Sequence, residues 1–170
     1  MTYLLHAALL LVIMLLRTTD LGRVLPFLSG YDLFLPYVMA LGFFRPVREG
    51  GLVTAMLALV LDLVSAAPFG LHAMAYGAVY AGAWWVPRFL EARNVFFLIL
   101  ASIVCVAAKD LLFWGAGVIN LGAAPDVPHL FEVLARSAGL AALSGWLLIL
   151  AVDGLCRKVD RWVTRQMKLE

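Results

Sequence analysis

Long runs of apolar residues, separated by short polar or turn-forming segments, make up most of this chain. Within a run the apolar residues are continuous and do not alternate with polar ones, as in Ala7–Leu16 and Val95–Ala108. Strands of a membrane β-barrel would alternate over about 10 residues, whereas a helical span needs about 20 mostly apolar residues. The pattern therefore predicts helices, and the expected fold class is an all-α polytopic membrane protein.

About six transmembrane helices are predicted from the runs, and five spans with a re-entrant segment fit nearly as well. The six predicted spans are Thr2–Leu16, Asp32–Phe44, Gly51–Ala66, Leu71–Val86, Val95–Val118 and Val133–Val152. They form one transmembrane domain over residues 1–152, and residues 153–170 form a tail. Pro68 and Gly70 fall between the third and fourth spans, where they predict a tight turn.

Composition supports a membrane protein over a soluble domain. The chain has 170 residues, of which 64% are hydrophobic and 14% are charged, and its mean hydropathy is +0.97. An ordinary globular domain has about 45–50% apolar and about 25% charged residues. The net charge is only +2, and the basic residues are explained by topology, so nucleic-acid binding is not expected.

The distribution of basic residues predicts the orientation of the spans. With six spans, both termini share one side with nine basic residues: Arg45, Arg48, Arg88, Arg93, Arg157, Lys158, Arg161, Arg165 and Lys168. The opposite side has three: Arg17, Arg23 and Arg136. Basic residues are enriched in cytoplasmic loops. We therefore expect both termini in the cytoplasm.

The tail after Val152 has an amphipathic helical pattern. Apolar residues recur at helical spacing from Val152 to Met167, and the other face is largely charged. The residues expected at the membrane interface are Arg157, Lys158, Arg161, Trp162 and Arg165. Such a helix is typical of one lying on anionic membrane lipids. A partner-docking helix fits the same pattern.

Ionisable residues fall inside two predicted spans. Asp62 lies in the third span, and Lys109 and Asp110 lie together in the fifth. At 1.5 Å per residue, Asp62 and Lys109 reach about the same depth in the membrane. An intramembrane Asp62–Lys109 ion pair that holds the helices in register is therefore predicted, because a lone charge there is costly. A proton or ion pathway, or snorkelling to the outer interface, remains possible.

Two sets of residues recur every four positions along the fourth span. His72, Tyr76 and Tyr80 share one face, where hydrogen-bonded packing is the expected role. A second set, Ala73, Gly77 and Ala81, lies beside them. Small residues at this spacing allow close approach of helices in membranes, so this set is predicted to pack against a neighbouring helix.

Signals for catalysis, cofactors and metals are missing from the sequence. It has no Gly-rich phosphate loop, no His-Glu-x-x-His and no Gly-x-Ser-x-Gly. No catalytic residue, cofactor or metal site is therefore expected, and the chain is predicted not to be an enzyme. Cys105 and Cys156 lie in helical patterns and are expected to be buried apolar side chains.

The segment between the third and fourth spans resembles the MreD family of bacterial rod-shape-determining membrane proteins. The matching residues are Asp62, Leu63, Ser65, Pro68, Gly70, Leu71, His72, Ala73 and Tyr76, with Asp32 and Leu33 opening the second span. The motif covers about sixteen residues of the chain. Lys109 and Asp110 do not correspond to anything in the family pattern.

The resemblance implies a non-enzymatic scaffold subunit of the bacterial cell-elongation complex, which directs peptidoglycan synthesis and rod shape. Its implied partners are an MreC-like bitopic protein, MreB, and the RodA–PBP2 synthase pair. The fold it implies is similar to the substrate-binding subunit of energy-coupling-factor transporters. A vitamin-type, small-molecule binding subunit of a membrane transporter is therefore the alternative function.

Overall fold

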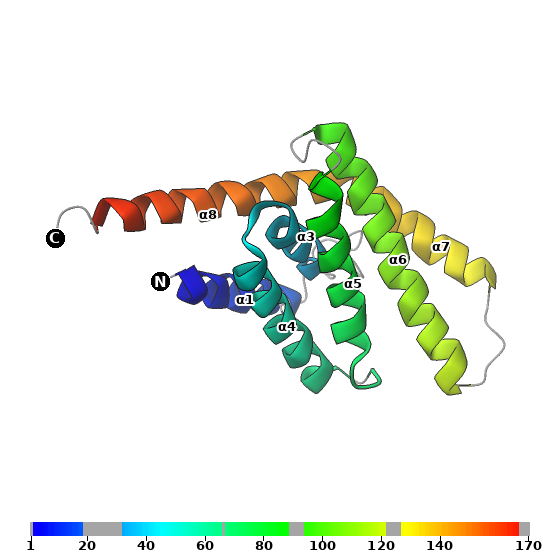
Figure 1. Ribbon diagram of the computed structural model, residues 1–170. Helices are drawn as coiled ribbons and strands as arrows, with labels where there is room; N and C mark the ends of the chain where they lie inside the picture. Colours follow the sequence, from blue (N-terminus) through cyan, green and yellow to red (C-terminus); the bar gives the residue numbers. More distant parts are fainter. Residues whose placement is uncertain (1, 19–31, 66, 89–93, 122–126, 167–170) are drawn as a thin grey trace.

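The computed structural model describes residues 2–18, 32–65, 67–88, 94–121 and 127–166 (Figure 1). These residues are almost entirely helical, and no strand occurs among them. The elements are α1 (Thr2–Thr18), α3 (Phe34–Phe44), α4 (Val47–Val64), α5 (Leu71–Trp85), the 3₁₀ turn η2 (Val86–Arg88), α6 (Val95–Leu121), α7 (Val127–Leu140), the π-helical turn η3 (Ala141–Gly145) and α8 (Trp146–Gln166). The predicted all-α fold class is confirmed.

Each predicted span falls on a helix, but two of the predicted boundaries are wrong. Helix α4 begins at Val47, directly after Pro46, whereas the apolar pattern placed the start of this span at Gly51. The sixth span begins earlier than Val133, because α7 starts at Val127. The helix also continues through Val152 as α8, which includes the predicted tail as far as Gln166, and residues 167–170 lie outside the described residues.

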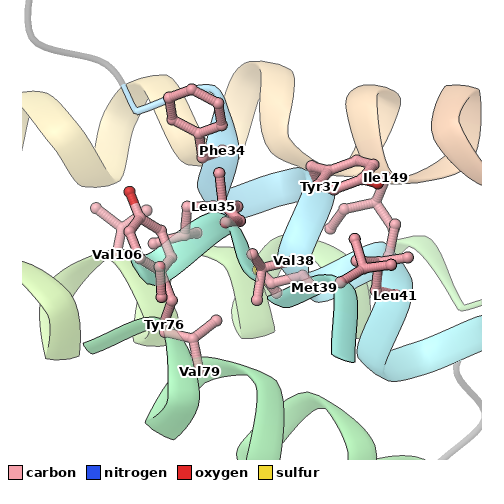
Figure 2. Packing of buried hydrophobic residues seen from close by; sticks show 14 of the residues in the cluster. Phe34, Leu35, Tyr37, Val38, Met39, Leu41, Tyr76, Val79, Val106 and Ile149 are labelled. Carbon is pink, nitrogen blue, oxygen red and sulfur yellow. The ribbon is translucent and has the colours of Figure 1, made fainter. Parts of the chain in front are cut away.

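Helix α3 forms the centre of the hydrophobic core. All of its residues from Phe34 to Gly42 are buried, and it packs against α4, α5, α6 and α8. Figure 2 shows side chains of α3, including Leu35, Val38 and Met39, packed among Tyr76, Val79, Val106 and Ile149. A helix that is apolar on every side is stable in a protein core or in lipid, and here the neighbouring helices bury it.

Helices α4 and α6 expose large apolar side chains and turn ionisable side chains inward. The buried face of α4 carries the polar residues Thr54 and Asp62. Its exposed face carries large apolar residues: Leu52, Met56, Leu59, Val60 and Leu63. Helix α6 repeats this pattern, with Phe96, Leu100 and Val104 exposed and Lys109 largely covered. Apolar residues outward and ionisable residues inward is the arrangement expected of helices in lipid.

Among the described residues, two helical segments are long and apolar enough to cross a membrane: Val95–Ile119, and Leu130–Val159, which runs from α7 through η3 into α8. The segments His6–Leu15 and Phe34–Phe44 are apolar but shorter. The two long segments are consistent with membrane association of the chain.

Helices α3 and α5 approach each other closely at Gly42. A Cβ atom added to Gly42 would lie 2.6 Å from the Cβ of Ala83 and 3.1 Å from the carbonyl oxygen of Tyr80. The predicted contact set on α5 is therefore wrong. Gly77 and Ala81 are exposed in this chain and Ala73 is half-buried, because Ala75, Val79 and Ala83 form the inward face of the helix.

Candidate functional site: a polar seam between the helices

The turn between α4 and α5 has the predicted residues at its centre. The amide of Leu71 donates to the carbonyl oxygen of Pro68 at 3.1 Å, which closes a four-residue turn. Gly70 has a φ of 91°, a left-handed conformation that glycine adopts without a steric penalty. Gly70 is also the N-cap residue of α5 and offers no side chain to the free amides of that helix.

Asp62 supplies from α4 the cap that Gly70 lacks. Its Oδ1 accepts the backbone amide of His72 at 2.9 Å, and its Oδ2 accepts the amide of Ala73 at 3.2 Å. These amides occupy the second and third positions of α5, which a local N-cap side chain would normally satisfy. The positive end of the α5 dipole also favours a carboxylate here. Asp62 therefore fastens the end of α4 to the start of α5.

The imidazole of His72 completes this contact, which we name the hairpin clasp (Asp62, His72, Ala73). Its Nδ1 lies 3.0 Å from Oδ1 of Asp62 and 3.4 Å from the hydroxyl oxygen of Ser65. Because the carboxylate already accepts two amides, Nδ1 is the donor to it. The side chains of Asp62 and His72 are 0% and 7% exposed, so the clasp is shielded from solvent.

Lys109 does not pair with Asp62, and that prediction is wrong. Both side chains are described, and they share no salt bridge: the Lys109 Nζ lies 3.2 Å from Oδ2 of Asp32 and 3.4 Å from Oδ1 of Asp110. The physical reason is that both oxygens of Asp62 are directed at the amides of α5. The lysine therefore neutralises Asp32, which directly precedes α3.

Asp32 was noted in the sequence only as a residue that opens the second span, and its contacts with other helices were not predicted. Its Oδ1 accepts the amide of Phe34 at 3.1 Å, so it caps the first turn of α3. Its Oδ2 accepts the hydroxyl of Tyr76 as well as the ammonium of Lys109. Asp32 thus joins α3, α5 and α6. Its position at the opening of an apolar run was visible in the sequence, but the identity of its distant partners was not.

Aromatic contacts connect the hairpin clasp to the Asp32 contacts. The rings of His72 and Tyr76 stack with their centroids 6.1 Å apart, and the ring of Phe113 meets His72 edge-on at 5.0 Å. The Lys109 Nζ lies 5.7 Å from the centroid of Phe113. The result is one continuous group, named the polar seam: Asp32, Asp62, His72, Tyr76, Lys109 and Asp110.

The contacts of His72, Tyr76 and Tyr80 on α5 agree with the hydrogen-bonded packing predicted for their shared face. His72 and Tyr76 are buried, and the half-buried Tyr80 donates its hydroxyl to the carbonyl oxygen of Val47 at 3.2 Å. Each of the three side chains therefore contacts another helix through a polar atom. This matches the expectation of hydrogen-bonded packing along α5.

A second polar cluster lies where α1 meets α3 and α4. His6 is 1% exposed, and its Nε2 and Nδ1 lie 2.8 Å from Oε1 of Glu49 and 2.8 Å from the hydroxyl of Tyr37. A guanidinium nitrogen of Arg45 lies 3.8 Å from the same Glu49 oxygen. The sequence reasoning missed this cluster, because His6 is a single polar residue in an apolar run.

The predicted interfacial residues lie on α8. Arg157 donates from Nε to Oδ1 of Asp153 at 2.9 Å and also contacts Oδ2 of the same side chain. Lys158 and Arg161 are exposed. The side chains of Trp162 and Arg165 lie outside the described residues.

The polar seam joins helices, and its described groups point toward one another. The Oδ2 atom of Asp110 is a buried exception with no hydrogen-bond partner in the described part of the chain. No group of three His, Cys, Asp or Glu side chains that could hold a metal ion occurs among the described residues. The arrangement is suited to fixing the geometry of α3, α4, α5 and α6.

Comparison with known proteins gives no family or function for this chain. No protein-family model, no curated protein and no solved structure matches this chain.

Proposed function

We propose that the chain is a multi-pass protein of a bacterial inner membrane with six spans and both termini in the cytoplasm. Within that membrane it acts as a non-enzymatic scaffold of the MreD type in the cell-elongation complex. Its partners are an MreC-like bitopic protein, MreB, and the RodA–PBP2 synthase pair. The resemblance of the segment from Asp62 to Tyr76 suggests the family, and the geometry of that segment supports a structural role.

The observation that carries the proposal is the hairpin clasp. The polar residues of the motif are directed at each other and at the first turn of α5. A reaction centre would keep a nucleophile or base free to meet a substrate, whereas here Asp62 is fully covered and accepts from two amides and a ring N–H. The motif therefore serves to display a rigid α4–α5 hairpin.

The outward apolar faces of α4 and α6 support the membrane placement. Large apolar side chains such as Leu63 and Phe96 are 75% and 84% exposed. Contiguous exposed apolar surface on this scale requires lipid or a partner to cover it. In the proposed arrangement, lipid covers most of this apolar surface and partner proteins cover the rest.

Affinity purification from membranes, in mild detergent, tests the scaffold role. The native chain is expected to carry a bitopic coiled-coil partner and cell-wall synthases with it. Depletion of the chain from a rod-shaped host is expected to give spherical cells. The transporter-subunit alternative predicts instead an ATPase module and a tightly bound vitamin, and recovery of these would overturn the scaffold role.

The hairpin clasp offers a matched control for this experiment. Asp62→Asn keeps the shape of the side chain and loses one of its acceptor oxygens, whereas Ser65→Ala removes only a long 3.4 Å contact. If the hairpin presents the binding surface, partner recovery is expected to fall with Asp62→Asn and to persist with Ser65→Ala. Equal recovery with both variants, at equal amounts of folded protein, would place the partner surface elsewhere.

A further inference from the structure

The outward face of the helix from α7 to α8 changes from apolar to basic along its length. Leu143, Leu147 and Leu155 are 74%, 52% and 42% exposed, and they lie on one face with the exposed Ala151 at four-residue spacing. We name this set the leucine stripe (Leu143, Leu147, Ala151, Leu155). The opposite face of α8, with Ile149 and Cys156, is buried, and α8 packs against α3.

Two exposed basic residues continue the leucine stripe. Lys158 follows Leu155 by one helical turn, and Arg161 follows Lys158 by another. Neither forms a salt bridge with any carboxylate whose side chain is described, whereas the neighbouring Arg157 is engaged with Asp153. Among the basic residues of α8 whose side chains are described, Lys158 and Arg161 are therefore the two that can meet an external anion, and Arg161 also donates from Nε to the carbonyl oxygen of Arg157 at 3.3 Å.

The length of this helix sets the position of its basic end. The apolar segment Leu130–Val159 has 30 residues, which corresponds to about 45 Å at 1.5 Å per residue. The hydrocarbon layer of a bilayer is about 30 Å thick. A helix of this length therefore reaches beyond the acyl chains, and its charged end lies in the layer of lipid headgroups.

We infer that the leucine stripe lies against acyl chains and that Lys158 and Arg161 bind the phosphate of an anionic lipid at the cytoplasmic surface. The order along the helix face, apolar first and basic next, matches the order of chemical groups in a phospholipid. Basic residues at such a surface attract anionic lipids. The inference rests on the membrane placement proposed above and is independent of the scaffold role.

Lipid binding to the full chain in neutral detergent tests the inference. Phosphatidylglycerol or phosphatidylcholine is titrated into the micelles, and the bound lipid is counted by native mass spectrometry. The native chain is expected to bind phosphatidylglycerol more tightly. Lys158→Gln and Arg161→Gln are each expected to weaken this binding about fivefold, and phosphatidylcholine binding is expected to stay constant.

Arg157→Gln is the matched control on the same turn of α8. Because Arg157 is already paired with Asp153, its loss is expected to change phosphatidylglycerol binding less than twofold. Glycerol phosphate, which has no acyl chains, is expected to compete poorly, and added salt is expected to weaken binding by screening.

Four outcomes would overturn the inference. The first is equal affinity for the two lipids, and the second is an equal loss of binding in Arg157→Gln and in the double variant Lys158→Gln/Arg161→Gln. The third is full competition by glycerol phosphate, and the fourth is unchanged lipid binding together with loss of a protein partner in that double variant. Alkaline extraction of membranes separates these outcomes from failure of the membrane placement. Release of the native chain from membranes by carbonate would contradict the membrane placement. If the chain stays in the membrane, the lipid titration tests only whether Lys158 and Arg161 of α8 bind anionic lipid.

Discussion

The carboxylate of Asp62 caps a helix to which it does not belong. It lies ten residues before His72 and accepts the backbone amide of that residue while contacting its ring nitrogen. This contact is needed because the N-cap position of α5 is occupied by Gly70, which has no side chain to offer. Gly70 therefore allows the tight turn, and the buried Asp62 supplies the cap that the glycine lacks.

Asp62→Asn is expected to lower the free energy of unfolding by about 1–3 kcal/mol, the usual cost of a buried polar group left without its partner. The carboxamide has one acceptor oxygen for the amides of His72 and Ala73, and its NH₂ group faces a donor. The measurement is reversible unfolding in mixed micelles with SDS, followed by tryptophan fluorescence.

Ser65→Ala is the control for this prediction, since the hydroxyl of Ser65 lies 3.4 Å from Nδ1 of His72. A contact that long contributes little, so the change in the free energy of unfolding is expected to stay within about 0.5 kcal/mol. An Asp62→Asn variant as stable as the native chain would show that the clasp is not needed for folding.

The ion pair between Asp32 and Lys109 is expected to show strong energetic coupling. Lys109→Met alone leaves the carboxylates of Asp32 and Asp110 without their cation in a covered site, which is strongly destabilising, whereas Asp32→Asn alone leaves Lys109 with Asp110 as its partner. The double variant removes the contact between Asp32 and Lys109 as a whole, so its loss of stability is expected to fall short of the sum by about 1–3 kcal/mol. The measurement is a double-mutant cycle on the free energy of unfolding.

A second cycle on Asp62 and Lys109 is the matched control. These residues do not pair in the structure, so their single effects are expected to add to within about 0.5 kcal/mol. If this cycle showed the larger coupling, the sequence-based pairing would be right and the geometry of the polar seam would be wrong.

The sequence predicted the helices well because the residues that specify each helix lie within that helix or in the adjoining turn. A continuous apolar run indicates a buried or lipid-facing helix wherever its neighbours lie, and Pro68 and Gly70 specify a turn through their own backbone preferences. The start of α4 was harder to place. Its first turn, from Val47 to Gly50, contains Arg48 and Glu49 and therefore does not look apolar.

The partners of the charged residues could not be predicted, because they depend on packing between distant segments. Counting depth along helices put Lys109 level with Asp62, but it gave no information on the direction of either side chain. Asp32 and Lys109 are 77 residues apart, and nothing local marks them as a pair. The same limit explains the error at Gly77, where spacing alone cannot say which of two neighbouring faces points inward.

Gly42→Ala is expected to destabilise the chain by about 1–3 kcal/mol, because the new methyl group would overpack the crossing of α3 and α5. Its Cβ would lie 2.6 Å from the Cβ of Ala83. Adding Ala83→Gly removes the other half of this clash and is expected to restore part of the loss. Thermal unfolding of the three chains in detergent measures both effects.

Gly77→Ala makes the same chemical change where nothing lies within 4 Å of the new Cβ. Alanine is the better helix former by up to about 1 kcal/mol, so this variant is expected to be as stable as the native chain or slightly more stable. A loss of stability equal to that of Gly42→Ala would mean that the exposed face of α5 is packed within the chain after all.

His6 is expected to hold α1 against the rest of the structure through Tyr37 and Glu49. A carboxylate accepts hydrogen bonds, so Nε2 of His6 donates to Glu49, and Nδ1 is paired with the hydroxyl of Tyr37. Tyr37→Phe leaves Nδ1 without this partner in a buried site, at a cost of about 1 kcal/mol. Amide hydrogen exchange is expected to become faster in α1 than in α5, because the loss falls on the contact that fixes α1.

Tyr80→Phe removes the same hydroxyl from a tyrosine that instead joins α5 to α4 through the carbonyl oxygen of Val47. This control is expected to leave exchange in α1 unchanged. If both variants speed amide exchange in α1 to the same extent, the His6 contact does not hold α1 in place. The helix would then be held by the packing of its half-buried side chains, such as Leu9 and Ile13. A selective effect of Tyr37→Phe would instead show that a single buried imidazole fixes the position of the first helix.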